Sequence, residues 1–375
     1  MKILQVNKLY SPHIGGIERV IQDIAEGLSD RYDIKVLVCQ PKGKAIDEII
    51  NSVSVRRSSS IGTFFSMPVS FQFLCDFRRL SRSADLVHIH MPFPLADIAC
   101  LLSGYKGKVV VSWHSDIVKQ KKMMTLYKPF MTALLKRADC ILVATPGHIT
   151  GSAYLGPYKE KCRVIPYGID IEAYEKAEAY DILTQKLTDP DSKKILFTGR
   201  LVYYKGVDVL LKAFCQTTDC ELFIAGDGIL RQDLENEAKA DNIEDRVHFL
   251  GRLSDSDLKA ALRDCDIFVL PSVENSEAFG IVQMEAMVYS KPVINTSLPT
   301  GVPYVSLDGE SAITVPPKDE KALAGAINTL VHDDQMRQQY GQEALRCVRE
   351  KYDMKKVMDS ISKMYEEITG QEVQG

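Results

Sequence analysis

The 375-residue sequence is poor in the features that define several common protein classes. Its nine cysteines are scattered and form no C-x-x-C motif, so the sequence predicts neither a disulfide framework nor a zinc site. It contains no run of about 18 apolar residues, so we expect no transmembrane helix. The first residues, MKILQVN, have the pattern of a strand and lack the long apolar stretch of a signal peptide. A cytoplasmic protein is therefore expected.

Several catalytic and nucleic-acid motifs are also missing. There is no G-x-x-x-x-G-K-[ST] loop and no G-x-S-x-G elbow, so P-loop and Ser-His-Asp hydrolase chemistry lose their main support. No helix-turn-helix, zinc-finger or RNP pattern is present, so nucleic acid is not an expected partner. His88 and His90 share one face of a predicted strand, but no third ligand follows at a recognisable spacing, and no metal site is expected.

The sequence does contain two series of short β-branched runs that alternate with amphipathic, helix-like stretches. Strands of this kind, separated by helices, predict parallel sheets covered on both faces, and the chain is long enough for two cores. The predicted fold class is α/β, with two doubly wound domains. We expect a first domain over residues 1–170, a linker over 171–192 and a second domain over 193–353. A final helix over about 354–370 is expected to pack back on the first domain.

Charge is unevenly distributed along the chain. Residues 56–137 contain 13 Lys or Arg and 4 Asp, a local balance of +9 in a chain whose net charge is −4. The stretch IGTFFSMPVSFQFLCDFRRL adds five Phe beside Arg78 and Arg79, and VKQKKMMTLYKPF adds Lys119, Lys121 and Lys122. Such a patch suits the surface of an anionic membrane. An ordinary helix with a core face and solvated lysines has the same pattern and is the alternative.

In open parallel sheets, ligands bind outside the carboxyl ends of the strands, so the segments that follow strands form the candidate site. YSPHIGG follows the first strand, and Gly15 and Gly16 would let backbone N–H groups approach an anion at a helix start. A plain tight turn is the alternative. Gly226 and Gly228 in AGDG also follow a strand, but without a third glycine they are weak evidence.

Charged and titratable side chains follow other predicted strands. In GRLVYYKG, Arg200 ends a strand and Lys205 lies five positions on, which suits the binding of a phosphate pair. Two solvated surface cations are the alternative. His114 follows the strand KVVVSW and could contact a substrate hydroxyl, although a lone histidine is more often structural.

The stretch NSEAFGIVQMEAM, residues 275–287, places Glu277 and Glu285 at either end of a nearly apolar run. If a helix begins near Ala278, the N–H groups of the next three residues face the strand ends. The carboxylates would then lie about 12 Å apart along the helix. That spacing suits a pyrophosphate flanked by a sugar and a ribose. A capping Glu277 and a surface Glu285 are the alternative.

Together these segments resemble a retaining GT-B glycosyltransferase of the large family 4, over nearly the whole chain. The resemblance is carried by IGGIERV, WHSD, IPYGID, GRLVYYKG, AGDG, HFLGRL, PSVENSEAFGIVQMEAM and KPVINTS. Glu-x7-Glu together with Arg-x4-Lys is a specific combination. The resemblance implies two Rossmann-like domains whose sheets face a central cleft. It also implies transfer of a sugar from a nucleoside-diphosphate sugar, with no cofactor and no metal.

The resemblance implies a role for each matching position. Arg200 and Lys205 would hold the diphosphate and stabilise it as the leaving group, and Gly16 would place its amide against the distal phosphate. Glu277 would bind sugar hydroxyls, and His114 would reach the transferred sugar. The catalytic residues implied are His114, Arg200, Lys205 and Glu277, and the donor-binding residues are Gly15, Gly16, Gly199, Gly226, Gly228, Phe249, Ala278, Phe279, Gly280, Ile281 and Glu285.

WHSDIVKQKK and TGVPYVS are similar to a subgroup of bacterial polysaccharide and O-antigen transferases, several of which use GDP-mannose. Mannose is therefore weakly favoured over a UDP-sugar, with a lipid-linked glycan acceptor at the inner face of the cell membrane. LPTGVPYV and DGESAITV depart from the family pattern beside the donor site, which leaves the sugar and the base open. A nucleotide-sugar epimerase of the same fold and a non-catalytic sugar-nucleotide-binding subunit are the alternatives.

Overall fold

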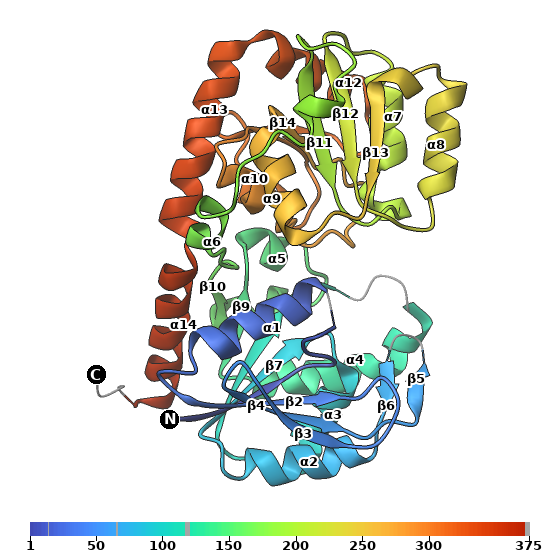
Figure 1. Cartoon of the computed structure of the whole chain (residues 1–375). Coiled ribbons are helices and arrows are strands. Elements are labelled where there is room, and N and C mark those ends of the chain that lie inside the picture. The colour runs from blue at the N-terminus through green and yellow to red at the C-terminus, as the bar shows by residue number, and fades with distance from the viewer. Residues whose placement is uncertain (14, 65–66, 117–120, 372–375) are drawn as a thin grey trace. The chain divides into compact units, whose positions relative to one another are not determined.

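The computed structural model describes residues 1–13, 15–64, 67–116 and 121–371, without the side chains of residues 121–124. The chain divides into two compact units (Figure 1). Unit 1 comprises Met1–Gly168 and Lys355–Gly375, and unit 2 comprises Ile169–Met354. Each unit is built around a sheet and a buried apolar core of its own.

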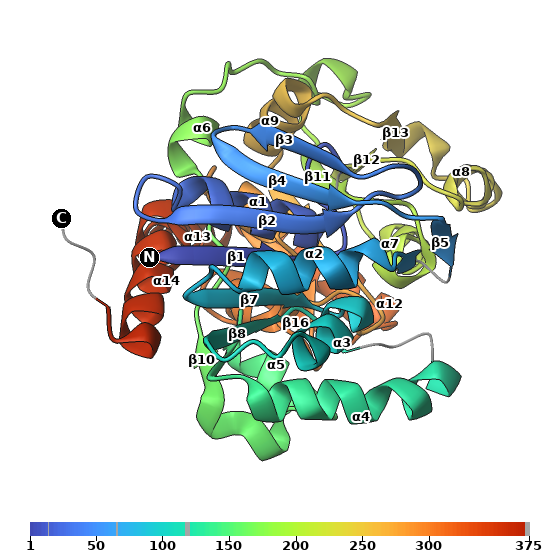
Figure 2. The same cartoon turned by 90° about the horizontal axis from the view of Figure 1, so that it is seen from below.

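Unit 1 contains an eight-stranded sheet with the order β10-β9-β8-β7-β1-β2-β4-β3, and Figure 2 shows its central strands side by side. Neighbouring strands pair in parallel except β3, which pairs antiparallel with β4 at the edge. The strands are β1 (Lys2–Val6), β2 (Asp33–Cys39), β3 (Ile46–Ile50), β4 (Val53–Ser58), β7 (Leu86–Met91), β8 (Lys108–Trp113), β9 (Cys140–Val143) and β10 (Cys162–Val164). A separate hairpin pairs β5 (Gly62–Phe64) with β6 (Met67–Val69).

The helices of unit 1 follow from local sequence. In α1, Val20, Ile21 and Ile24 recur at helical spacing and are buried. Helix α3 begins with Pro94, whose missing N–H costs nothing in the first turn, and ends at Gly104 with a left-handed φ of 73°. The helices are α1 (Gly16–Gly27), α2 (Gln72–Ser81), α3 (Pro94–Ser103), α4 (Lys121–Arg137), α5 (Pro146–Thr150), η1 (Gly156–Lys161) and α14 (Met354–Thr369).

Unit 2 contains a six-stranded, fully parallel sheet with the order β13-β12-β11-β14-β15-β16. The strands are β11 (Lys193–Thr198), β12 (Cys220–Ala225), β13 (Val247–Gly251), β14 (Ile267–Val269), β15 (Val293–Thr296) and β16 (Ala312–Val315). The helices are α6 (Ile171–Glu175), η2 (Thr184–Lys186), η3 (Tyr203–Lys205), α7 (Val207–Phe214), α8 (Arg231–Ala240), η4 (Glu244–Arg246), α9 (Asp255–Asp264), α10 (Val282–Met287), α11 (Val302–Val305), α12 (Glu320–His332), α13 (Asp334–Cys347) and η5 (Val348–Tyr352).

Residues 171–192, which the sequence suggests as a linker, lie in unit 2 and contain α6 and η2. The carboxylate of Asp264, at the end of α9, accepts hydrogen bonds from the backbone N–H groups of Leu183 (2.7 Å) and Thr184 (2.9 Å). Tyr289 donates to the carbonyl of Tyr174 at 2.7 Å. These bonds attach the segment to the body of unit 2.

The C-terminal helix belongs to unit 1. Helix α13 passes through the π-helical turn η5 and into α14, which begins at Met354, where the sequence predicts the start of the final helix. Figure 1 shows α14 beside α1. Tyr32 shares a hydrogen bond with Ser362 (2.6 Å), and Arg31 forms an ion pair with Asp359 (2.7 Å). The side chain of Tyr365 is fully buried in this contact.

Both sheets have a doubly wound strand order, which confirms the predicted fold class. In unit 1 the direction of winding reverses between β1 and β7, and in unit 2 it reverses between β11 and β14. Ligands of such sheets bind at this reversal, outside the carboxyl ends of the strands. The two reversals therefore locate one candidate site in each unit.

Candidate active site

The site of unit 2 centres on an ion pair between two loops. Lys205 lies in the loop that follows β11, and Glu277 lies in the loop that follows β14. Lys205 Nζ is 2.5 Å from Glu277 Oε2, and both residues are buried, at 7% and 8% exposed. Ser272 donates a further hydrogen bond to the same carboxylate oxygen at 3.0 Å. Because an unpaired buried charge is costly, each partner holds the other at the sheet edge.

Arg200 is the second cation of this site, and its surroundings differ. It is exposed, and its Nη2 donates to the hydroxyl of Tyr204 at 3.1 Å. Gly199 immediately precedes Arg200, and a Cβ there would lie 3.6 Å from Lys205 Nζ. The loop after β11 thus presents a buried ammonium and an accessible guanidinium, a combination that suits two adjacent phosphates.

The helix that follows Glu277 starts later than the sequence suggests. The prediction of a start near Ala278 is wrong, because α10 begins at Val282 with Ile281 as its N-cap. Gly280 adopts a left-handed φ of 77°, and a Cβ there would lie 2.5 Å from a methyl of Leu270. This conformation interrupts the helix and bends the segment before α10. Glu277 and Glu285 are therefore not on one continuous helix.

A buried amide network fixes that bend. Gln283, fully buried, donates from Nε2 to the carbonyls of Phe279 and Val302, both at 3.2 Å. Its Oε1 accepts from Ser306 Oγ at 2.7 Å and from Asn295 Nδ2 at 3.2 Å. Gln283 could not be singled out from the sequence, since one polar residue in an apolar run has no evident partner. Glu285, two residues on, is half-buried on α10.

The AGDG loop packs closely against the loop of Arg200. Leu201 N–H donates to the carbonyl of Asp227 at 3.0 Å, and a Cβ on Gly226 would lie 1.9 Å from the carbonyl oxygen of Gly199. Any side chain at position 226 would clash with this carbonyl, so the packing of the two loops is enough to require glycine there. Gly228 approaches the backbone of Leu201 in the same way. Phe249, in β13, is partly buried against the core of unit 2.

The site of unit 1 lies where β1, β7 and β8 end. Gly15 is the N-cap of α1 and Gly16 its first residue. Apart from its chain neighbours and the backbone of its own helix, no atom of the described residues lies within 4 Å of a Cβ built on Gly16, so packing does not demand glycine there. His114 directly follows β8 and is 3% exposed.

His114 is one member of a buried polar chain that the sequence did not predict. Its Nδ1 is 2.6 Å from the hydroxyl of Tyr167, and its Nε2 is 3.0 Å from His90 Nδ1. Burial lowers the pKa of His114 to about 3 and that of His88 to about 3, and it lowers the pKa of His90 well below its usual value. These imidazoles are therefore neutral at physiological pH. Tyr167 belongs to the IPYGID motif, the one sequence signal that could have identified it.

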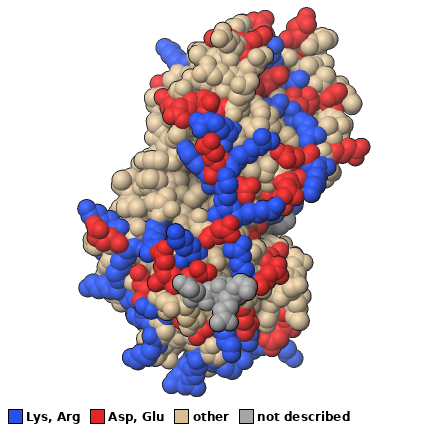
Figure 3. Space-filling model, turned by 90° about the vertical axis from the view of Figure 1, so that its left-hand side faces the viewer, with Lys and Arg blue, Asp and Glu red and all other residues tan. Residues whose placement is uncertain are grey.

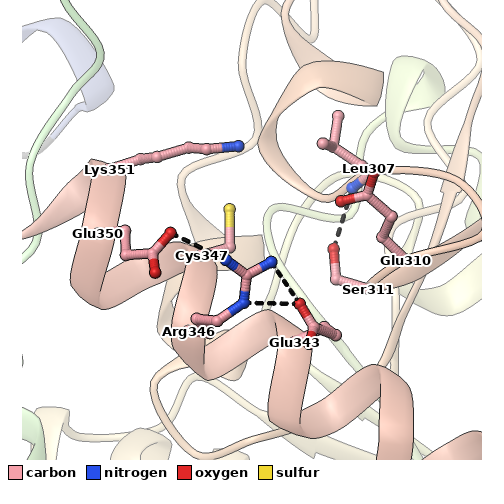
Figure 4. Close-up of a pocket in the computed structure, with 8 residues that line it drawn as sticks. All are labelled: Leu307, Glu310, Ser311, Glu343, Arg346, Cys347, Glu350 and Lys351. Atoms are coloured by element: carbon pink, nitrogen blue, oxygen red, sulfur yellow. Dashed lines mark hydrogen bonds and ion pairs between the residues drawn. The ribbon is translucent and has the colours of Figure 1, made fainter.

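One pocket lies outside the candidate site. A small pocket of unit 2, drawn in Figure 4, is lined by Leu307, Glu310, Ser311, Glu343, Arg346, Cys347, Glu350 and Lys351. Ser311 immediately precedes β16, so the pocket lies at the amino ends of the strands, and Arg346 there is paired with Glu343 (2.6 Å) and Glu350 (3.0 Å). On the face drawn in Figure 3, Lys and Arg are interspersed with Asp and Glu.

Within the described residues, no three His, Cys, Asp or Glu side chains are grouped so that they could hold a metal ion. No helix in the described part of the chain is long and apolar enough to cross a membrane.

Comparison with known proteins assigns the family. A model described as Glycosyltransferase Family 4 matches residues 14–173, and one described as Glycosyl transferases group 1 matches residues 181–346. The D-rhamnosyltransferase WbpZ of Pseudomonas aeruginosa is 35% identical over 350 residues, which is 92% of this chain and 90% of that protein. The chain belongs to glycosyltransferase family 4. The O-antigen chain mannosyltransferase C of Escherichia coli is 30% identical over 367 residues, covering 97% and 98% of the two chains.

Solved structures show the GT-B fold of this family 4 transferase. The sucrose-phosphate synthase of Thermosynechococcus elongatus superposes with a TM-score of 0.78 at 21% identity, covering 98% of this chain and 99% of that one. WaaG, a glycosyltransferase involved in lipopolysaccharide biosynthesis, gives 0.68 at 17% identity, with coverages of 98% and 100%. Family 4 enzymes take their sugar from a nucleotide sugar, with retention of configuration and without a metal ion. The chain is accordingly a nucleotide-sugar glycosyltransferase of the kind that builds O-antigens and related polysaccharides.

Proposed function

We propose that this transferase moves a hexose from a nucleoside-diphosphate sugar to a hydroxyl of a lipid-linked glycan. The observation that carries the proposal is the pairing of Lys205 with Glu277 at 2.5 Å, next to the accessible Arg200, at the winding reversal of unit 2. A cation pair at that edge suits a diphosphate, and a carboxylate beside it suits the hydroxyls of the attached sugar.

The departure of the diphosphate explains why cations are needed at this site. As the bond to the sugar breaks, negative charge develops on the phosphate oxygens, and fixed cations stabilise it without reorganisation. Lys205 carries three N–H donors, so it can keep its contact with Glu277 and still donate to a phosphate. Arg200 adds a planar, two-pronged donor.

The remaining residues are proposed to bind the donor. His114 and Glu277 would contact the transferred sugar, and Glu285 would accept hydrogen bonds from the ribose. Backbone groups would bind the phosphates and the base. The proposed donor-binding residues are Gly15, Gly16, Gly199, Gly226, Gly228, Phe249, Ala278, Phe279, Gly280, Ile281 and Glu285.

Three kinds of sugar donor are supported. The WHSDIVKQKK and TGVPYVS stretches favour mannose from GDP-mannose, and a relative with 30% identity is named a mannosyltransferase. A relative with 35% identity is named a D-rhamnosyltransferase, which makes a deoxyhexose the second candidate. HepE of Anabaena, solved in complex with UDP, supports a UDP-sugar as the third.

A donor panel tests the proposal. The purified chain would be heated with GDP-mannose, GDP-rhamnose, UDP-glucose, ADP-glucose and the free diphosphates. At a concentration about 100-fold above Kd, the true donor stabilises the native state by about 2.7 kcal/mol. Transfer is then measured as label moving from that donor into the lipid fraction of bacterial membranes. Stabilisation by none of the sugars, or label remaining in a free nucleotide sugar of altered stereochemistry, would refute the transfer reaction.

A lipid-linked acceptor implies contact with the inner face of the membrane, and unit 1 offers a surface for it. Helices α2 and α3 pack together, as do α3 and α4, so the three form one layer. Phe71, Leu126 and Phe130 are exposed there, while Phe73 and Phe77 belong to the core, so only part of the predicted aromatic patch faces outward. Of the lysines in the predicted patch, Lys119 lies outside the described residues, as do the side chains of Lys121 and Lys122.

Co-sedimentation with vesicles tests the membrane contact. The chain should sediment with vesicles that contain phosphatidylglycerol, should remain in solution with pure phosphatidylcholine, and should dissociate as salt is raised. A Leu126→Ser/Phe130→Ser variant should lose most of the binding. Ile229→Ser, which changes an exposed apolar residue of unit 2, is the matched control. Equal binding to both vesicle types would contradict the proposal.

A further inference from the structure

A continuous hydrogen-bonded chain runs through the interior of unit 1. It links the C-terminal helix α14 to the loop after β10 and passes through the central strands β1, β7 and β8. Its members, in order, are Ser112, His88, Tyr365, Gln5, His90, His114 and Tyr167. All are buried except Tyr167, which is half-buried at the end of the chain.

The direction of this chain follows from the amide of Gln5. Gln5 Nε2 donates to the hydroxyl of Tyr365 at 3.1 Å, so Gln5 Oε1 is the atom that faces His90 Nε2, at 2.7 Å. A carbonyl oxygen only accepts, so His90 must carry its proton on Nε2. The Nδ1 of a neutral His90 is then an acceptor.

The same reasoning fixes the next ring. His90 Nδ1 accepts from His114 Nε2 at 3.0 Å, so His114 also carries its proton on Nε2. His114 Nδ1 is left as an acceptor, and the hydroxyl of Tyr167 donates to it at 2.6 Å. The other titratable groups that act on the ring, His88 and His148, have pKa values that burial lowers to about 3 and about 4. They add no charge at neutral pH.

We propose that His114 offers the substrate an acceptor nitrogen, Nδ1, which the hydroxyl of Tyr167 occupies in the free chain and a hydroxyl of the donor sugar takes over on binding. Gln5 and His90 are positioning residues that fix this tautomer. The hydroxyl of Tyr365 accepts a hydrogen bond from Gln5 and so fixes the orientation of its amide. Helix α14, which carries Tyr365, is therefore part of the same network. This proposal rests on the sugar contact proposed for His114 above, and it adds the direction of that hydrogen bond.

The proton positions can be measured without any substrate. Full-length chain labelled with 15N-histidine would be studied by long-range 1H–15N NMR, with His114 assigned through the shift that Tyr167→Phe causes. His90 and His114 should both carry a proton on Nε2 and none on Nδ1, unchanged between about pH 6 and 8. A proton on Nδ1 of His114, or a charged ring in that interval, would overturn the proposal. Because this readout needs no activity, it stands even if the proposed donor is wrong.

Kinetics test the exchange of partners. In Tyr167→Phe the acceptor nitrogen has lost its internal donor, so the sugar hydroxyl no longer competes for it. The donor KM should fall roughly two- to tenfold, the range of one net hydrogen bond, while kcat changes little. Tyr105→Phe removes one tyrosine hydrogen bond elsewhere in unit 1, to the carbonyl of Ala84, and should leave KM unchanged. A raised or unaltered KM in Tyr167→Phe would refute the exchange.

Removal of a positioning residue should impair the enzyme, in contrast to the improved donor binding expected of Tyr167→Phe. In Gln5→Met, His90 is free to adopt either tautomer, and the NMR signal of His114 should show both. The activity should fall by about 10- to 100-fold, as when the partner that orients a functional histidine is lost. A single unchanged tautomer in this variant, or full activity with mixed tautomers, would contradict the positioning role.

Discussion

Lys205 Nζ lies 2.5 Å from Glu277 Oε2, although the two residues stand on different loops, 72 positions apart in the sequence. The pair exists because β11 and β14 are neighbours in the sheet, so the loops that follow them meet at one edge. Both side chains are nearly excluded from solvent. Each charge is held in place by the other, in the position that we propose for a ligand carrying phosphate and hydroxyl groups together.

Lys205→Ala should lower kcat by about 100- to 1000-fold, because removal of one fixed donor to a developing anion costs roughly 2.7–4 kcal/mol. The measurement is the initial rate of sugar transfer at saturating donor. Lys212→Ala, which removes a half-exposed lysine of α7 in the same unit, should retain the full rate. A loss smaller than about threefold would correspond to under 1 kcal/mol and would exclude the role in departure of the diphosphate.

Glu277→Gln should distinguish binding of the sugar from binding of the phosphates, because it should weaken only the former. The variant keeps an acceptor for Ser272 but loses the charge that pairs with Lys205, so an added diphosphate finds an unpaired ammonium. We expect the free nucleoside diphosphate to bind at least as tightly as in the unaltered chain, and the nucleotide sugar to lose affinity. Isothermal titration with both ligands measures the difference. The control is Glu274→Gln in the same loop, where the half-buried glutamate pairs with Lys318, and it should behave like the unaltered chain.

Gln283→Leu should destabilise the chain by about 1–3 kcal/mol, the cost of leaving buried polar groups without partners. The groups affected are the carbonyls of Phe279 and Val302 and the side chains of Asn295 and Ser306. Urea unfolding of unit 2 would show this, and donor affinity should fall with it because the bend before α10 is loosened. Gln232→Leu on the exposed face of α8 is the control. Unchanged stability would mean that the network does not hold the bend.

Asp97 gives a prediction for pH. Burial raises the pKa of this carboxyl to about 7, and among the described residues only its Oδ2 is hydrogen-bonded, by the hydroxyl of Tyr127. The folded chain therefore binds a proton more readily than the unfolded chain. Stability from this group is present below the unfolded pKa, near 4, and is lost as pH rises toward 7, at about 1.4 kcal/mol per pH unit.

Asp97→Asn should abolish that dependence. Urea titrations from about pH 5 to 8 would measure the free energy of unfolding of both proteins. The free energy of unfolding of the unaltered chain should fall relative to that of the variant as pH rises. Asp233→Asn, at an exposed position of α8, should run parallel to the unaltered chain at every pH. A difference that does not vary with pH would show that Asp97 titrates normally.

Much of the site could be predicted because its residues stand at the ends of strands. The apolar runs before His114, Arg200 and Glu277 identify parallel strands, and in a parallel sheet the carboxyl ends share one edge. The later start of α10 could not be predicted, because it depends on the left-handed Gly280 and on bonds from Gln283 to distant carbonyls.

The sequence by itself determined the α/β class, the strands, and the cations and carboxylates that follow them, because those properties arise from local periodicity and residue type. Only the tertiary structure decided which of these groups meet. Gln5 and Tyr365 are separated by 360 positions and touch because α14 returns to unit 1, and that contact orients His90 and, through it, His114. Local patterns carry no record of such partners, since hydrogen bonds between side chains depend on distance in space and not on separation along the chain.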